Sequence, residues 1–399
     1  MKSLADIDVS GKRLLVRADL NVPVQNGQVT DATRIERFAS GMRPLLERGA
    51  RLVILTHFGR PKAGEDPALS TRQLQAALSK ALGRVVGFVS ACRGRDAEAA
   101  AARLVDGGVL LCENVRFEPG EEQNDEGLAR DFARLGDIFV NDAFSCAHRA
   151  HASTEAVARL MPAFAGPLME EELQALEAAL AAPRRPAVAI VGGAKVSSKI
   201  AVLKNLVGKL DAVIIGGGMA NTFLYAQGAP MGRSLHEADQ LKTVYEIEAL
   251  AARSGCRILL PDDVMVAAEF REGAPARSVP FDECPADMMI LDAGPRSVRL
   301  FQEELSRART ILWNGPLGAF EIAPFDRATT ALSRSAAALT DAEQVVSVAG
   351  GGDTVAALNR AEVTERFTYV STAGGAFLEW LEGRVLPGVA ALSAEPETV

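Results

Sequence analysis

Two lysines near the middle of the sequence have a spacing that suits a phosphate ligand. An apolar run over 188–191 ends at Gly192-Gly193, and Lys195 and Lys199 follow. The apolar spacing that comes next predicts a helix, so both ammonium groups are expected on one helix face. Two neighbouring cations repel unless an anion lies between them, and the start of a helix also favours an anion. The stretch predicts a polyphosphate site, against the alternative of a surface helix with two solvated lysines.

A second group of cations belongs to the first half of the chain. Its arginines follow apolar runs or open a helical pattern, at Arg17, Arg34, Arg60, Arg116 and Arg149. One such arginine is more readily explained as a surface ion pair, whereas five favour a common ligand. Guanidinium groups bind phosphate and carboxylate through paired hydrogen bonds. The first half is therefore expected to bind a small polyanion. Asp19 and Asn21 would accept hydrogen bonds from the hydroxyl groups of this ligand.

The second half places glycines after its apolar runs instead. They lie in the stretches 216–218, 314–318, 350–354 and 374–375. A single glycine run often serves only close helix–strand packing, but four of them, with the lysine pair, favour a groove for a nucleotide polyphosphate. Asp353 follows three glycines, where a carboxylate serves either as a helix cap or as a ligand of phosphate-bound Mg²⁺.

Alternating apolar runs and helical patterns are expected to position these groups. The apolar runs predict strands near 13–17, 51–55, 85–89, 109–112 and 137–140, then near 187–191, 212–215, 257–260, 310–313, 345–348 and 367–370. Helical patterns lie between most of them, as at 34–47, 71–81 and 96–104. This alternation predicts parallel sheets covered by helices, whose ligands bind beyond the carboxyl ends of the strands. At 399 residues the chain is long for one core, and the segment 166–182 predicts a helix that connects two domains.

Composition narrows the class of protein. The net charge of −8 argues against a nucleic-acid surface. The five cysteines form no CxxC pair, which favours reduced thiols in a cytoplasm over a zinc or redox site. His148 and His151 have no third ligand for a metal beside them. No apolar run reaches the roughly 18 residues of a membrane helix, and the first residues lack an apolar signal region.

Nine motifs together resemble the phosphoglycerate kinase family over nearly the whole chain. They are RADLNVP (17–23), HFGRPK (57–62), ENVRF (113–117), NDAF (141–144), AHRAHAS (147–153), GGAKVS (192–197), WNGPLGAFE (313–321), GGGDT (350–354) and LEGRVLPGV (381–389). The resemblance implies an α/β fold with two doubly wound, Rossmann-like parallel-sheet domains joined by a helix, as in a hinge-bending kinase. It implies a phosphoglycerate-binding domain over 1–168 with a returning segment 378–399, and a nucleotide-binding domain over 169–377 that includes the linker helix.

The implied activity is that of a phosphotransferase with a carboxyl group as acceptor. It would move the acyl phosphate of 1,3-bisphosphoglycerate to MgADP, giving 3-phosphoglycerate and MgATP, reversibly, in glycolysis, gluconeogenesis or carbon fixation. The resemblance implies a cytoplasmic monomer that uses Mg²⁺ and has no nucleic-acid or membrane partner. Such transfer needs alignment and charge neutralisation rather than a protein nucleophile, and water must be excluded from the acyl phosphate.

The resemblance also implies the site residues. The phosphoglycerate site would comprise Asp19, Asn21, Arg34, His57, Arg60, Arg116 and Arg149. The nucleotide site would comprise Lys195, Lys199, Asn314, Glu321, Gly350, Gly351, Gly352, Asp353 and Thr354, with Glu321 at the ribose and Asp353 at the metal. The catalytic set would be Arg34, Lys195, Gly351 and Gly375. In that set the two cations would neutralise the phosphoryl group in transit, and the two glycines would donate backbone N–H groups.

Some positions depart from the family pattern, and two alternatives stay open. The departures are Ser145, Cys146, Ser198, Ile290, Ala373 and Phe377, and they concern adenine fit and domain closure rather than the charged groups. One alternative is a non-catalytic binding or scaffold protein on the same fold, against which the intact Arg34, Lys195, Lys199 and Asp353 argue. The other is a kinase for a different small carboxylate, which the arginine cluster disfavours if the substrate lacks a distal phosphate.

Overall fold

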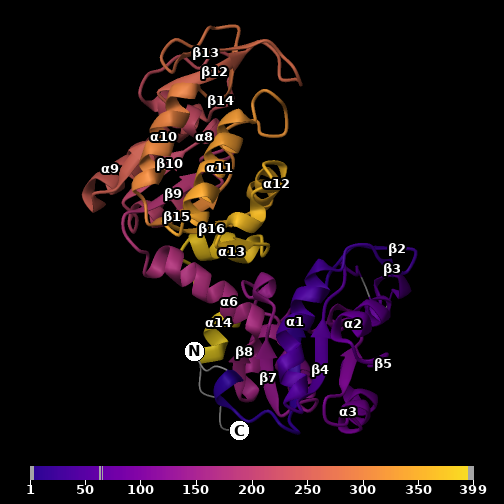
Figure 1. The fold of residues 1–399 in the computed structure, drawn as a ribbon. Helices are drawn as coiled ribbons and strands as arrows, with labels where there is room; N and C mark the ends of the chain where they lie inside the picture. Colours follow the sequence, from indigo (N-terminus) through magenta and orange to yellow (C-terminus); the bar gives the residue numbers. More distant parts are fainter. Residues whose placement is uncertain (1–3, 63, 65, 394–399) are drawn as a thin grey trace. The chain divides into compact units, whose positions relative to one another are not determined.

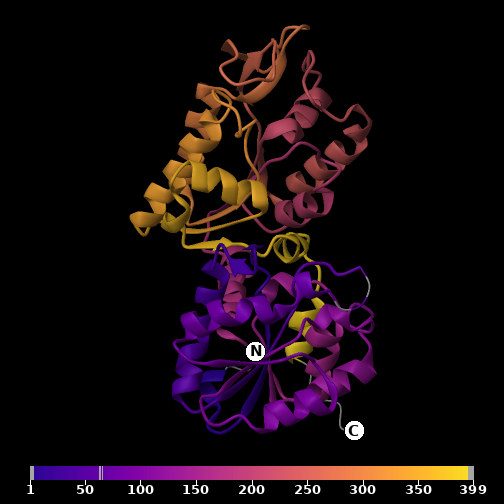
Figure 2. The ribbon, with the colours of Figure 1, turned by 90° about the vertical axis from the view of Figure 1, so that its right-hand side faces the viewer.

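The chain consists of two units, which are apparent in the computed structural model (Figures 1 and 2). The structure describes residues 4–62, 64 and 66–393. One unit spans Met1–Glu172 together with Val385–Val399, and the other spans Leu173–Arg384. We call them unit 1 and unit 2. The assignment of phosphoglycerate binding to one domain and nucleotide binding to the other stays a prediction at this point.

Unit 1 is built on a six-stranded parallel sheet in the order β5-β6-β4-β1-β7-β8. Its strands are β1 (Arg13–Ala18), β4 (Arg51–Thr56), β5 (Val86–Val89), β6 (Val109–Cys112), β7 (Ile138–Asn141) and β8 (Ala163–Ala165). Five of them confirm the strands predicted from apolar runs. The sequence analysis missed β8, because an apolar run of only three residues gives no recognisable pattern.

Helices surround the sheet of unit 1 (Figure 2). They are α1 (Thr33–Glu47), α2 (Gln75–Leu82), α3 (Gly94–Ala102), α4 (Glu126–Ala133), α5 (Val157–Leu160), the first part of α6 (Pro167–Leu176) and α14 (Pro387–Ala390). A two-stranded ribbon, β2 (Val24–Gln25) and β3 (Gln28–Val29), precedes α1. The apolar face of α1, with Ile35, Phe38 and Met42, is fully buried against Val16 and Ile54 of the sheet. Burial of this face fixes α1, and with it Arg34 at its start, on the sheet.

Unit 2 repeats this architecture with the strand order β11-β10-β9-β15-β16-β17, again parallel. Its strands are β9 (Ala187–Val191), β10 (Ala212–Ile215), β11 (Arg257–Leu259), β15 (Thr310–Asn314), β16 (Val346–Gly350) and β17 (Tyr369–Ser371). Its helices are α7 (Ile200–Val207), α8 (Gly217–Ala226), α9 (Leu241–Ser254), α10 (Pro295–Arg307), α11 (Arg327–Asp341), α12 (Gly352–Arg360) and α13 (Gly375–Leu381). The predicted α/β fold with two parallel sheets is confirmed.

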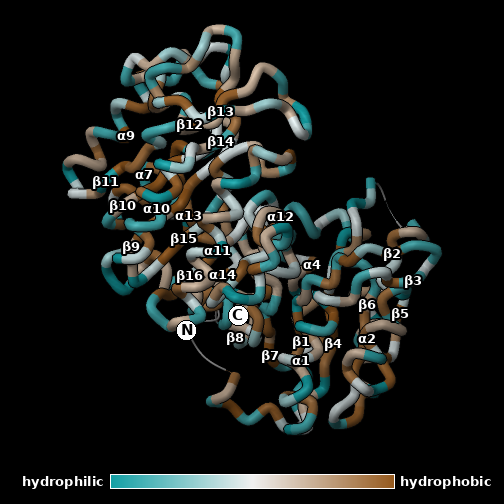
Figure 3. Tube along the Cα trace, turned by 45° about the horizontal axis from the view of Figure 1, so that its top comes forward, coloured by the Kyte–Doolittle hydropathy of each residue, from teal (hydrophilic) through white to brown (hydrophobic). Residues whose placement is uncertain are grey.

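A small antiparallel sheet in unit 2 was not predicted. It has the order β13-β12-β14 and consists of β12 (Asp263–Ala267), β13 (Ala276–Pro280) and β14 (Met289–Ala293). Four of the five β13 residues are intermediate or exposed, and its sequence, Ala-Arg-Ser-Val-Pro, carries no apolar run. The main strands, by contrast, are largely hydrophobic along the chain trace (Figure 3). Among the described residues, no helix is both long and apolar enough to cross a membrane.

The predicted connecting helix is present as α6, which continues into one π-helical turn, Glu177–Ala181. The chain passes from unit 1 to unit 2 inside α6, between Glu172 and Leu173, and it returns to unit 1 between Arg384 and Val385. These two peptide segments are the covalent connections between the units.

Candidate active site

The predicted polyanion site lies beyond the carboxyl ends of the strands in unit 1, and we call this side of the sheet its carboxyl edge. The neighbouring strands β6, β4, β1 and β7 are parallel, so their carboxyl ends share this edge. The loops that follow them carry the predicted phosphoglycerate residues, and α1 adds Arg34. This is the edge at which open parallel sheets bind ligands.

Asp19 is the acceptor on which several donors of this edge converge. Arg34 Nη1 donates to Asp19 Oδ2 at 3.0 Å and to the carbonyl oxygen of Asn21 at 3.2 Å. Ser145 Oγ donates to the same carboxylate oxygen at 2.5 Å. Burial alone would raise the pKa of Asp19, but the charge of Arg34 and these hydrogen bonds lower it, so the carboxylate stays ionised. The Arg34 side chain is still 41% exposed and can reach a ligand.

The side chain of Arg17 binds protein atoms in the interior and does not face a ligand. Its side chain is fully buried and donates to Ser153 Oγ at 2.8 Å and to the carbonyl oxygen of Ala18 at 2.6 Å. Its Nη2 lies 3.2 Å from Nδ1 of His57, which must accept because a guanidinium only donates. Burial and then the charge of Arg17 lower the pKa of His57 to about 3. His57 is therefore a neutral imidazole held in one orientation.

Three more arginines supply the positive charge of this edge. The side chain of Arg116 is largely buried, donates to the carbonyl oxygen of Gly59 at 2.7 Å and lies 3.4 Å from the carboxylate of Glu122, and Arg149 Nε donates to His148 Nε2 at 3.2 Å. Burial lowers the pKa of Arg116 and the charge of Arg149 acts in the same direction, although the charge of Glu122 opposes them. Arg60 is exposed and makes no hydrogen bond or ion pair with any described residue. Cations gathered in this way are stabilised by an anion of several charges.

A buried carboxyl group that the sequence did not reveal completes the support. Glu121 is fully buried and accepts from the backbone nitrogen of Ser153 at 2.9 Å and from its hydroxyl at 2.5 Å. Burial raises the pKa of Glu121 and lowers that of nearby His151 to about 4. Glu121 stands in a run of acidic residues that reads as a solvated loop. Ser153 closes the AHRAHAS motif and was the one available indication of this network.

The lysine pair of unit 2 does not share a helix face, so that prediction is wrong. Helix α7 begins only at Ile200, and Lys199 is the residue directly before it, whose side chain makes no capping hydrogen bond. The preceding loop cannot continue the helix because the backbone nitrogen and hydroxyl of Ser197 both donate to Glu237, at 2.9 and 2.5 Å. Lys195 therefore belongs to a loop that Glu237 holds, and not to the first turn of α7.

The two lysines differ in what surrounds them. Lys199 Nζ donates to the carbonyl oxygens of Gly192 at 2.7 Å and Asn314 at 3.0 Å. Burial lowers the pKa of Lys199 to about 8, although the charge of Asp353 acts in the opposite direction. Lys195 is exposed, and its ammonium group has no hydrogen bond or ion pair within the described part of the chain, although its carbonyl oxygen accepts from Ser198 Oγ at 2.7 Å. Lys199 thus joins two strand ends, while Lys195 is available to a ligand.

The loop after β16 carries further residues of the predicted nucleotide site. Asn314 Nδ2 donates to the carbonyl oxygen of Gly350 at 2.8 Å, and the backbone nitrogen of Gly315 donates to Thr354 Oγ1 at 2.7 Å. Gly351 has φ +97°, and a Cβ there would lie 2.7 Å from Asn314 Nδ2. The position therefore requires glycine on both backbone and steric grounds. The buried Oδ1 of Asn314 lacks a hydrogen-bond partner among the described residues.

Helix α12 starts in this loop and directs its free N–H groups toward the same place. The residue before it, Gly351, has no side chain to cap them. Asp353 is exposed in the first turn, and its carboxylate makes no hydrogen bond or ion pair with the residues that the structure describes. One protein carboxylate together with substrate phosphates is the ligand set that Mg²⁺ prefers, so this position fits the ion. The described residues contain no cluster of three or more His, Cys, Asp or Glu that could hold a metal without a substrate.

Two further predicted residues lie in neighbouring loops of unit 2. Glu321 is exposed, and its backbone oxygen accepts from Arg360 of α12 at 3.1 Å. Gly375 opens α13 directly after β17, which pairs with β16 in the sheet. Both loops therefore neighbour the strand that carries the 350–354 loop.

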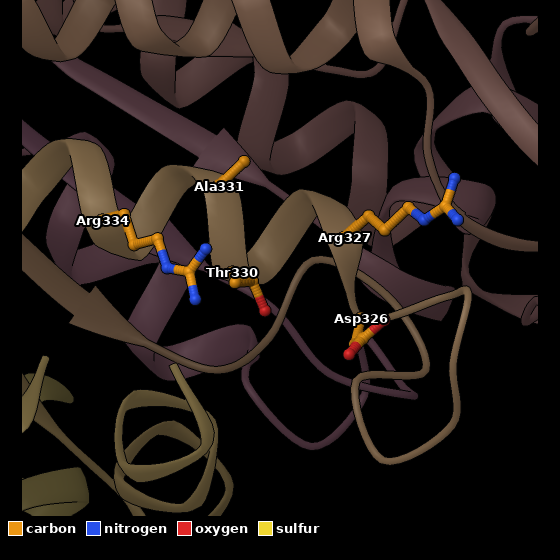
Figure 4. A pocket seen from close by; sticks show the side chains of 5 residues that line it. All are labelled: Asp326, Arg327, Thr330, Ala331 and Arg334. Carbon is orange, nitrogen blue, oxygen red and sulfur yellow. The ribbon is translucent and has the colours of Figure 1, made fainter. Parts of the chain in front are cut away.

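An open surface cavity of about 240 Å³ lies apart from these residues on α11 (Figure 4). It is lined by Asp326, Arg327, Thr330, Ala331 and Arg334. None of the predicted substrate or nucleotide residues lines it.

Comparisons with known proteins bear on the whole chain. Residues 4–384 match the family model of phosphoglycerate kinase. The chain is 59% identical to a phosphoglycerate kinase of Ruegeria sp. (strain TM1040), over 98% of this chain and 99% of that protein. It is 58% identical to one of Rhizobium meliloti (strain 1021), over 97% and 98%. The structure of phosphoglycerate kinase from Coxiella burnetii is similar, with a TM-score of 0.92 and 42% identity over 98% of both chains.

Proposed function

The chain belongs to the phosphoglycerate kinase family, and from this premise we propose how its two units divide the reaction. It is an ATP-binding kinase of glycolysis. It reversibly transfers phosphate from 1,3-bisphosphoglycerate to ADP, giving 3-phosphoglycerate and ATP. The alternative of a non-catalytic binding protein and that of a kinase for another carboxylate are both excluded by this family membership.

Unit 1 binds the phosphoglycerate in this proposal. The observation that carries it is the gathering of Arg34, Arg60, Arg116 and Arg149 at one edge of one sheet, above the buried Arg17. The arginine forks suit the distal phosphate and the carboxylate of the ligand. Asp19, Asn21 and the neutral His57 supply directional polar groups for its hydroxyl.

Unit 2 binds the nucleotide. The polyphosphate is held by Lys195, by Lys199 and by the loop from Gly350 to Thr354, where α12 starts. Asn314 positions this loop, and Glu321 lies where it can accept from a ribose hydroxyl. Asp353 holds Mg²⁺ against the phosphates, and the bound ion supplies charge neutralisation.

Transfer itself is assisted by groups from both units. We place Arg34 and Lys195 on the phosphoryl group in transit, because both side chains are exposed and Lys195 is not engaged elsewhere in the described chain. Gly351 and Gly375 donate backbone N–H groups to the same oxygens. No side-chain nucleophile is required, since phosphoryl transfer depends on alignment and on neutralising charge. Transfer takes place only when the two bound substrates meet.

The remaining properties follow from the same proposal. The enzyme uses Mg²⁺, acts as a monomer in the cytoplasm and has no nucleic-acid or membrane partner. The five cysteines are free thiols, which supports a reducing compartment. The net charge of −8 supports the absence of a nucleic-acid partner.

A coupled assay of ATP formation from ADP tests the recognition of the distal phosphate. Its two phosphoryl donors are 1,3-bisphosphoglycerate and acetyl phosphate, each with and without Mg²⁺. We expect turnover with the first donor, dependence on Mg²⁺, and a kcat/KM for acetyl phosphate lower by at least about a hundredfold, because two or more charged hydrogen bonds are lost. Comparable kcat/KM values for the two donors would contradict the role given to the arginines.

A further inference from the structure

A short segment after β7 contacts three separate parts of unit 1. It runs from Asn141 to Ala147, and we call it the β7 segment. On one side it reaches the proposed phosphoglycerate site: Ser145 Oγ donates to Asp19, and Cys146 Sγ lies 3.9 Å from His57 Nδ1. Its other contacts lie with α6 and with the returning end of the chain.

Asp142 of this segment caps α6 across a gap of 26 residues. Its Oδ1 accepts from the backbone nitrogens of Leu168 at 2.7 Å and Met169 at 3.4 Å. Gly166, the residue before the helix, has no side chain that could do this, and a Cβ there would lie 2.3 Å from Asp142 Oδ1. Glycine at 166 therefore leaves the space in which Asp142 satisfies the free N–H groups of the helix start.

The burial of Asp142 costs more free energy than a cap needs if it serves only to stabilise a helix. Asp142 is 3% exposed, and its second oxygen, Oδ2, is buried without a hydrogen-bond partner in the described chain. A buried carboxyl oxygen without a partner costs free energy. Helix α4 of the same unit shows the cheaper solution, since the exposed Asp125 directly before it accepts from Leu128 at 2.7 Å.

The returning end of the chain is bound to the same segment. Asn141 Nδ2 donates to the carbonyl oxygen of Gly388 at 3.3 Å, and the backbone nitrogen of Gly388 donates to the carbonyl oxygen of Ala147 at 2.9 Å. Gly388 comes soon after the return of the chain at Arg384–Val385, and α6 contains the other passage between the units. Both covalent connections therefore leave unit 1 from elements that are hydrogen-bonded to the β7 segment.

We propose that Asp142 is a positioning residue for catalysis, through which the β7 segment holds the first turn of α6 in register with the phosphoglycerate site. Helix α6 carries the chain into the unit that binds the nucleotide, so its start affects how the two substrates are presented to each other. Misplacement by about 1 Å can slow an aligned reaction a hundredfold without any loss of binding contacts. The proposal rests on the assignment of the phosphoglycerate site to unit 1.

Four variants of the full-length enzyme test this role. Asp142→Ala removes the cap, Asp142→Asn keeps an acceptor at the same place, and Gly166→Ala displaces the carboxylate without removing it. Asp125→Ala is the matched control, because it removes an aspartate cap from another helix of unit 1. For each variant, kcat and the KM values are measured, together with calorimetric binding of 3-phosphoglycerate and a thermal melt.

Asp142→Ala and Gly166→Ala are expected to lower kcat by about tenfold or more, while the Kd for 3-phosphoglycerate changes less than about threefold. Asp142→Asn is expected to stay within about threefold of the parent kcat. Asp125→Ala is expected to lower Tm and leave kcat unchanged. If Asp142→Ala does not fold, Gly166→Ala and Asp142→Asn decide the question.

Three results would overturn the proposal. They are an unchanged kcat in Gly166→Ala and in any folded Asp142→Ala, a fall in kcat that Asp125→Ala reproduces, or an Asp142→Asn variant as slow as Asp142→Ala. Arg116→Ala shows separately whether the underlying assignment holds. If Arg116→Ala leaves 3-phosphoglycerate binding intact, the proposed function itself fails. If Arg116→Ala weakens that binding while Gly166→Ala keeps the parent kcat, only the role of Asp142 is contradicted.

Discussion

The two half-sites stand on sheets of the same architecture but are made from different parts of the chain. In unit 1 the groups at the sheet edge are side chains, and several of them bind one another: Arg34 with Asp19, and the buried Arg17 with His57. In unit 2 the corresponding edge is made of glycine loops and a helix start, and the ammonium group of Lys195 is free of described partners. Side chains prearranged in this way suit a small ligand with distinct ends, whereas backbone N–H groups suit a polyphosphate.

The difference also concerns what is already satisfied in the protein alone. The carboxylate of Asp19 has its donors, while Asp353 has no hydrogen-bond or ion-pair partner among the described residues. A site whose charges are already paired changes little on binding, and one with free charges gains more from its ligand and metal. Substitutions in unit 1 should therefore act through specific contacts, and those in unit 2 through the charge of the nucleotide complex.

Arg34→Ala should have the largest effect, because it removes a cation that we assign to the transition state. An interaction made only in the transition state lowers kcat and leaves ground-state binding nearly unchanged. We expect kcat to fall by on the order of a hundredfold, similar to the loss of one oxyanion donor, with only a few-fold change in either Kd. Steady-state kinetics and a melt decide this, since a lower Tm with a normal kcat would make Arg34 merely the partner of Asp19.

Asp353→Asn should have the next largest effect. We expect this effect only on the proposed nucleotide site in unit 2. Asparagine keeps the ability to cap α12 but loses the charge that holds Mg²⁺. We expect turnover to fall by about tenfold or more, with little change in Tm and in 3-phosphoglycerate affinity. MgADP affinity and turnover close to those of the parent would show that Asp353 is only a helix cap.

A smaller effect should appear in the pH dependence of nucleotide binding. Burial lowers the pKa of Lys199 to about 8, so its ammonium group loses the proton as the pH rises through that value. Binding of MgADP should weaken by up to about tenfold per pH unit above 8 if the charged form is required, while 3-phosphoglycerate binding shows no such change. Calorimetry at pH 7 to 9 measures this, with Lys199→Gln as the control that should lose the dependence. A pH-independent affinity in the parent would contradict a charged Lys199 in the complex.

Much of the fold could be predicted because its strands are buried on both faces. Such strands read as continuous apolar runs, and the main strands of both sheets appeared in this way. Strand β8 escaped because it is too short, and β13 because it is largely exposed, while β12 and β14 were missed although they are largely buried. Pairing with distant strands, which no local pattern records, forms these elements.

The charged residues of the candidate site could be predicted from the sequence, but the buried residues that hold them in place could not. The predicted cations lie at the carboxyl ends of strands, since that topology follows from the strand pattern. The start of α7 was wrong because the contact of Ser197 with Glu237 joins residues 40 positions apart. The burial of Arg17 and Glu121 likewise depends on contacts across the fold, and in sequence both residues look like solvated charges.

The division of labour between the units is tested most directly by a crossed calorimetric titration. The side chains of Arg60 and Lys195 are both exposed and bind no described residue, so their removal should not disturb either unit. Arg60→Ala and Lys195→Ala are each titrated with 3-phosphoglycerate and with MgATP. We predict that Arg60→Ala weakens only 3-phosphoglycerate and Lys195→Ala only MgATP, each by roughly tenfold. Weakening of both ligands by one variant, or of the opposite ligand, would contradict the account.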